Sequence, residues 1–126
     1  MKGIKVGAKA NKLHFLHGLG WVRNDPAGTV VGTFVIHYVD GQTVDVPVRL
    51  VEDGFDWHLS NWRRNSPSGT DSKLAWRGAS GIGQEVELGV YLKTWSNPRP
   101  DVEISTLDFI SAMNDANPFL LALTLE

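Results

Sequence analysis

Tryptophan is the residue type in this sequence whose number and placement could support ligand chemistry. There are five tryptophans among 126 residues, more than an average composition supplies. Three of them fall in irregular segments, where their neighbours are polar or charged. A flat indole face stacks on the apolar face of a pyranose ring, while nearby polar side chains hydrogen-bond the sugar hydroxyls. The candidate ligand-binding residues are Trp21, Asp56, Trp57, His58, Asn61, Trp62, Arg63 and Arg64.

The tryptophans also admit a purely structural interpretation. Trp76 and Trp95 lie within strand-like runs, so we expect them to pack in or under a sheet. Trp57 or Trp62 could equally pin its long loop to the rest of the domain. The solvent exposure of the indoles decides between a binding surface and a core, because a sugar can stack only on an exposed ring.

No arrangement of residues predicts a catalytic or metal site. The 14 acidic residues sit mostly at turns or point outward along strands, which does not suit a facing pair of catalytic carboxylates. Cysteine is absent, and no serine lies in a nucleophile elbow. His14 and His17 would point to opposite faces of a strand, so one metal ion could not use both. The sequence therefore favours a protein that binds without catalysis, and an enzyme is the weakest reading.

The charge and the hydropathy of the chain argue against two classes of partner, nucleic acids and membranes. The formal net charge is -2, from 12 basic and 14 acidic residues, whereas nucleic-acid binders usually carry a basic face. No apolar run reaches the roughly 18 residues that a membrane span needs. The first residues lack the apolar core of a signal peptide and suggest a strand. We expect neither nucleic acid nor a membrane as partner.

The elements that would position the candidate residues are strands. Asp40-Gly41 is flanked by two β-branched runs within residues 28–50, which predicts a hairpin. Pro47 in its second arm indicates an edge position or a bulge. Residues 86–92 alternate apolar and other side chains, as in a central strand, and residues 51–72 form one long irregular connection. About eight strands without an amphipathic helix predict one antiparallel β-sandwich or barrel over residues 1–126.

Several segments together resemble an accessory module appended to bacterial polysaccharide-degrading enzymes and other large extracellular proteins: KGIKVGAKA (2–10), LHFLH (13–17), IHYVDG (36–41), AW (75–76) and WSNPRPDVEI (95–104). The chain resembles a galactose-binding-like, jelly-roll carbohydrate-binding module. The resemblance implies a secreted, non-catalytic domain that binds a polysaccharide or oligosaccharide and keeps a parent enzyme, in the same polypeptide, near it. The alternative is a structural or protein-interaction β-sandwich of a larger extracellular protein.

Modules of that wider fold often hold a structural calcium ion between loops. Here Asp25, Asp101 and Asp108 are the carboxylates that could contribute to such a site. No Asp-x-Asp-x-Asp-Gly loop marks one. No cofactor is therefore expected from the sequence itself.

Overall fold

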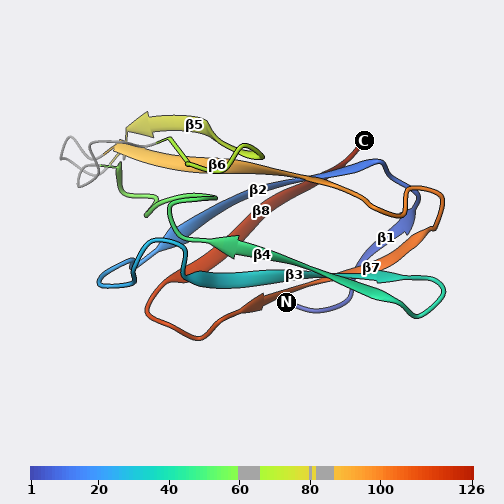
Figure 1. Cartoon of the computed structure of the whole chain (residues 1–126). Coiled ribbons are helices and arrows are strands. Elements are labelled where there is room, and N and C mark those ends of the chain that lie inside the picture. The colour runs from blue at the N-terminus through green and yellow to red at the C-terminus, as the bar shows by residue number, and fades with distance from the viewer. Residues whose placement is uncertain (60–65, 80, 82–86) are drawn as a thin grey trace.

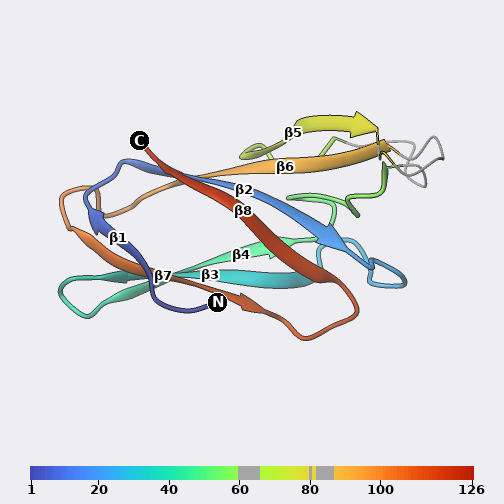
Figure 2. The same cartoon turned by 180° about the vertical axis from the view of Figure 1, so that it is seen from behind.

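The computed structural model describes residues 1–59, 66–79, 81 and 87–126. Within them lie β1 (Ile4–Ala8), β2 (Lys12–Gly20), β3 (Val30–Tyr38), β4 (Thr43–Arg49), β5 (Ser72–Ala79), β6 (Glu87–Ser96), β7 (Ile104–Ser111) and β8 (Asn117–Leu125). They form two antiparallel four-stranded sheets, in the orders β1-β7-β3-β4 and β5-β6-β2-β8. The sheets pack face to face (Figures 1 and 2). The predicted antiparallel β-sandwich of about eight strands is confirmed.

Alternating side chains of the central strands form the core between the sheets. Leu13 and Phe15 of β2 are fully buried, as are the facing residues Phe34 and Ile36 of β3. The rings of Phe15 and Phe34 stack with centroids 4.0 Å apart, and Phe34 stacks in turn on Phe109 of β7 at 4.3 Å. Burying each such side chain contributes about 1.5–3 kcal/mol, so this stack fixes one sheet on the other.

The β3–β4 hairpin forms where the sequence predicts it. Gly41 has a φ of 84°, which a residue with a Cβ adopts only at a cost. The Asp40 carboxylate accepts a hydrogen bond from the Gln42 amide at 3.1 Å and stabilises the turn. Strand β4 lies at the edge of its sheet and has a neighbouring strand on one side only. Pro47, which has no amide proton to donate, is tolerated at such an edge.

Strand β6 is central, between β5 and β2, as its alternating sequence predicts. The orientation of its two faces is less expected. Tyr91 is fully buried between the sheets and Lys93 is 6% exposed, whereas Leu88, Val90 and Leu92 occupy the other, outward face. The more apolar side of β6 therefore faces away from the core between the sheets, although Val90 on that side is only 9% exposed, and a lysine occupies the interior.

Among the residues that the structure describes, no helix is long and apolar enough to cross a bilayer.

Candidate functional site

Three of the candidate residues, Asp56, Trp57 and His58, fill the gap where β2 and β6 separate at one end of the sandwich. Asp56 pairs with Leu19 of β2 in parallel fashion, and His58 pairs with Leu88 of β6 in antiparallel fashion. The Trp57 amide donates to the carbonyl of Leu19 at 2.7 Å. The three residues therefore act as a short extra strand, which gives Trp57 a fixed backbone although it lies in a connection.

Asp56 joins this segment to the loop that follows β2. Its Oδ2 accepts a hydrogen bond from the Val22 amide, and its Oδ1 accepts one from the His58 amide, both at 2.9 Å. Charge-assisted hydrogen bonds of this kind are stronger than neutral ones. Asp56 thus holds Trp21 and Trp57, which adjoin the two bonded amides, at the same end of the molecule.

Both described loop tryptophans present their indoles to solvent. Trp21 is 67% exposed and Trp57 is 36% exposed. Trp21 has a φ of 59°, a left-handed conformation uncommon for a residue other than glycine. The guanidinium carbon of Arg23 lies 5.9 Å from the centre of the Trp21 ring, within cation–π range. An exposed indole next to polar groups is the arrangement expected of a stacking site.

Trp57 also has a structural role, so the two interpretations of this residue are not exclusive. Its ring meets the rings of His58 and Phe119 edge to face, with centroids 5.1 and 5.8 Å apart. Such contacts contribute about 0.5–1.5 kcal/mol each beyond area burial. They orient the indole and leave part of it free for a ligand.

Four of the predicted residues fall on a part of the chain that the structure does not describe. Asn61, Trp62, Arg63 and Arg64 lie outside the described residues. Their assignment to a ligand site stays a prediction.

The prediction that Trp76 and Trp95 both pack under a sheet is half right. Trp95 is partly buried and packs against the core. Trp76 is 52% exposed, so for this residue the prediction is wrong. The physical reason is its position, because Trp76 lies on edge strand β5 opposite Val90, which belongs to the outward face of β6. A strand pattern indicates alternation but not which face looks inward.

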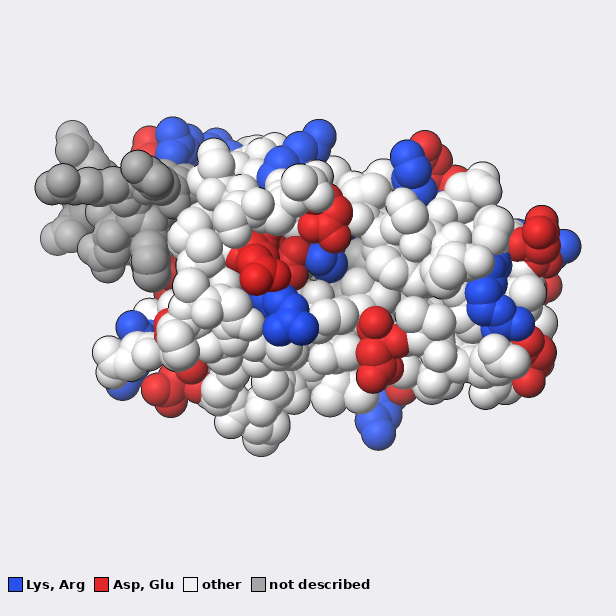
Figure 3. Space-filling view, in the orientation of Figure 1, with Lys and Arg blue, Asp and Glu red and all other residues white. Residues whose placement is uncertain are grey.

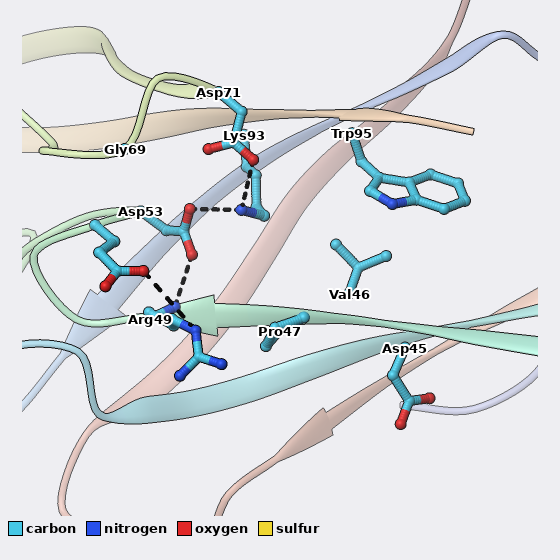
Figure 4. A pocket seen from close by; sticks show the side chains of 10 residues that line it. Asp45, Val46, Pro47, Arg49, Asp53, Gly69, Asp71, Lys93 and Trp95 are labelled. Atoms are coloured by element: carbon cyan, nitrogen blue, oxygen red, sulfur yellow. Dashed lines mark hydrogen bonds and ion pairs between the residues drawn. The ribbon is translucent and has the colours of Figure 1, made fainter. Parts of the chain in front are cut away.

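A pocket of about 270 Å³, which no sequence pattern predicts, opens between β4 and the start of β5 (Figure 4). Lys93 reaches into it and donates to Asp53 Oδ1 at 2.6 Å and to Asp71 Oδ2 at 3.0 Å. Asp53 is 2% exposed and also accepts hydrogen bonds from the Arg49 amide and the Ser72 hydroxyl, at 2.7 and 2.8 Å. Acidic and basic side chains meet at the opening of the pocket (Figure 3).

This ion-pair cluster is chiefly structural. Lys93 belongs to β6 in one sheet, and Asp53 follows β4 in the other, so their pairing joins the two sheets at the open side of the sandwich. Each carboxylate oxygen of Asp53 has a partner, and the lysine has two carboxylates. The sequence contains no local signal of this pairing, because the alternation of β6 puts Lys93 on the face opposite Leu88, Val90 and Leu92.

His17 is buried near this cluster and differs from the other described strand histidines. His14 contacts Thr94 and Glu126, and His37 contacts Asp108. Neither ring nitrogen of His17 makes a hydrogen bond of ordinary geometry to the described residues. Burial lowers the pKa of His17 from 6.5 to about 4; the Asp53 carboxylate opposes this effect and the Lys93 ammonium adds to it. The imidazole is therefore neutral at pH 7.

Within residues 1–59, 66–79, 81 and 87–126, no group of three or more His, Cys, Asp or Glu could hold a metal ion. Asp108, one of the carboxylates considered for calcium, accepts hydrogen bonds from the Gly3 amide and from His37, which hold its pKa below the usual value. Comparison with protein-family models, with curated proteins and with solved structures finds no match to this chain.

Proposed function

We propose that this chain is a non-catalytic carbohydrate-binding module that holds a parent enzyme, within the same extracellular polypeptide, at a polysaccharide. One observation carries the proposal: Trp21 and Trp57 expose their indoles at the same end of the sandwich, where Asp56 bonds to the backbone beside each of them. The sequence resemblance to galactose-binding-like, jelly-roll accessory modules supports the same conclusion.

The chemistry of the site suits a hydroxyl-rich ligand. Each exposed indole offers an apolar face to a sugar ring, while Asp56, His58 and Arg23 can exchange hydrogen bonds with hydroxyl groups. By analogy with aromatic pairs, each stacked ring contributes about 0.5–1.5 kcal/mol. After the cost of ordering the ligand, two such rings and a few hydrogen bonds correspond to micromolar to millimolar dissociation constants.

The direct test is affinity electrophoresis against soluble xylan, galactomannan, β-glucan and pectin, followed by titration calorimetry on any glycan that retards the protein. Trp21→Ala and Trp57→Ala should each weaken binding roughly two- to tenfold. Val39→Ala is the control, because Val39 is 58% exposed but lies at the β3–β4 turn, at the other end of the sandwich (Figure 1).

Stability must be measured alongside affinity, because Trp57 also contacts Phe119. Its replacement should cost clearly less than the roughly 3–5 kcal/mol of a fully buried aromatic residue. If no glycan in the panel retards the wild-type protein, the carbohydrate proposal fails. A protein-interaction domain, whose exposed aromatic residues dock on a partner, then becomes the better explanation.

A further inference from the structure

The exposed indole of Trp76 lies against its own strand, β5, at a position where that strand has a glycine and no side chain. A Cβ atom built on Gly78 would lie 2.2 Å from two carbons of the Trp76 six-membered ring, far inside van der Waals contact. The ring therefore lies directly over the glycine backbone, and 52% of the residue is open to solvent. Only glycine at position 78 allows this geometry, which gives the edge strand β5 a flat aromatic surface.

The same arrangement recurs on β2, in the same sheet. A Cβ atom on Gly18 would lie 2.3 Å from the ring of Phe119, so this ring also lies over a glycine. A Cβ atom on Gly20 would lie 3.9 Å from the indole of Trp57, an ordinary van der Waals contact that places this indole beside Gly20. Gly18 pairs with Phe119 and alternates with the buried His17, so these rings lie on the outward face of the sheet. Aromatic rings laid over glycines thus cover the outer side of the β5-β6-β2-β8 sheet near one end.

A polar hollow lies farther along the same face. Its volume is about 400 Å³. The side chains that line it include hydroxyls and amines that can donate to or accept from a ligand: Thr70, Thr94, Ser96, Lys12 and Lys73. Lys12 lies 4.0 Å from Glu126, and Lys73 forms no ion pair within the described part of the chain. Asp71 also lines the hollow, so the hollow offers hydrogen bonds without a large excess of either charge.

The outward side chains of β6 connect these features into one track. Leu88 pairs with His58 beside Trp57, Val90 pairs with Trp76 and Leu92 pairs with Lys73. The next outward residues of β6, Thr94 and Ser96, line the hollow. At about 3.4 Å per residue, the distance from Leu88 to Ser96 is roughly 27 Å. The partly exposed Leu88 and Leu92, with the nearly buried Val90 between them, therefore join the stacking surface to the hydrogen-bonding hollow.

We propose that an extended, hydroxyl-rich polysaccharide chain binds along the outward face of β6, from Trp57 past Trp76 to this hollow. The inference rests on the proposed function and extends it, because it makes Trp76 a ligand-binding residue. Flat rings seated on glycines suit a sugar face, and the short hydroxyl side chains that follow suit its edges. The length of the track suits a polymer rather than a single sugar.

The experiment uses the polysaccharide that binds the wild-type protein, together with short and long oligosaccharides cut from it. Trp76→Ala should weaken binding of the long oligosaccharides and the polymer roughly two- to tenfold. It should weaken binding of the short ones as well, because the Trp76 ring lies over Gly78, which pairs with Leu88 as His58 does. Lys73→Ala, in the hollow at the far end of the track, should instead weaken binding of the long oligosaccharides alone. Gly78→Ala should cause a loss similar to that in Trp76→Ala, because its methyl group displaces an indole that is still present. Trp76→Tyr keeps a ring and should retain most of the affinity, and Val39→Ala is again the control.

The outcomes separate the two proposals. If the wild-type protein binds and Trp57→Ala weakens binding, but Trp76→Ala and Gly78→Ala bind long chains like the wild type, the track is wrong while the proposed function stands. Equal losses for short and long oligosaccharides in Lys73→Ala would also overturn the track. A wild-type dimer that Trp76→Ala abolishes, seen by analytical ultracentrifugation, would identify a second copy as the occupant and overturn it too. Binding of no glycan at all removes the proposed function itself.

Discussion

Replacing the buried His17 with leucine should remove much of the acid sensitivity of this fold. In the folded protein the pKa of His17 is lowered from 6.5 to about 4, mainly by burial. Between these values the unfolded chain binds a proton that the folded chain does not, so stability is complete above pH 6.5 and falls as the pH drops towards 4. At about 1.4 kcal/mol per pKa unit, the full loss is roughly 3 kcal/mol.

The assay is urea unfolding, followed by circular dichroism, at a series of pH values from 7.5 to 4.5. Over this range, protonation of His17 should cost the wild-type protein about 2–3 kcal/mol of unfolding free energy. The total loss of unfolding free energy in His17→Leu should be smaller than that of the wild type by this amount. His58→Gln, a change at an exposed histidine that keeps the buried imidazole, should follow the wild type. If wild type and His17→Leu lose stability in parallel, the reasoning from burial is wrong.

Two further predictions concern buried polar groups. Lys93→Met should cost about 3–5 kcal/mol of unfolding free energy, because it leaves the Asp53 carboxylate buried without its cation. Asp53→Asn should cost less, because Lys93 keeps Asp71 as a partner at 3.0 Å. The double variant should cost less than the sum of the two, and additivity in urea unfolding would contradict a direct pair. Asn97→Ala should cost about 2–4 kcal/mol of unfolding free energy. Asn97 accepts a hydrogen bond from the buried Tyr38 hydroxyl at 2.6 Å and donates one to the Ala10 carbonyl at 2.7 Å. A melting temperature equal to that of the wild type would refute this role.

Sequence reasoning predicted the strands better than the side of the sheet on which their residues lie. The β3–β4 hairpin followed from Asp40-Gly41, because a tight turn needs the positive φ that glycine supplies. Pro47 predicts an edge position or a bulge, since proline cannot donate to a ladder, and β4 lies at the edge of its sheet. Both signals are local, so a single sequence contains them.

The features that sequence reasoning missed depend on contacts between distant segments. Lys93 lies in the interior because Asp53, 40 positions earlier in the chain, meets it there at 2.6 Å, and no local pattern reports such a pairing. Trp76 was assigned to the core because alternation does not distinguish the two faces of a strand. Its exposure depends on the outward orientation of Val90 and on Gly78, which a sequence alone suggests to be a break in the strand.

The pairing of β2 with β8 has a consequence for how the chain folds. Leu13 pairs with Leu125, and Ile4 of β1 pairs with Leu107 of β7, so both sheets join residues from opposite ends of the sequence. Contacts between such distant residues form only after long loops have closed, which costs conformational entropy. Proteins dominated by such contacts therefore fold in milliseconds to seconds. During synthesis, β2 cannot pair with β8 until β8 has left the ribosome, so the edge of β2 that faces β8 stays unpaired until then. We therefore expect this domain to fold late and as a unit.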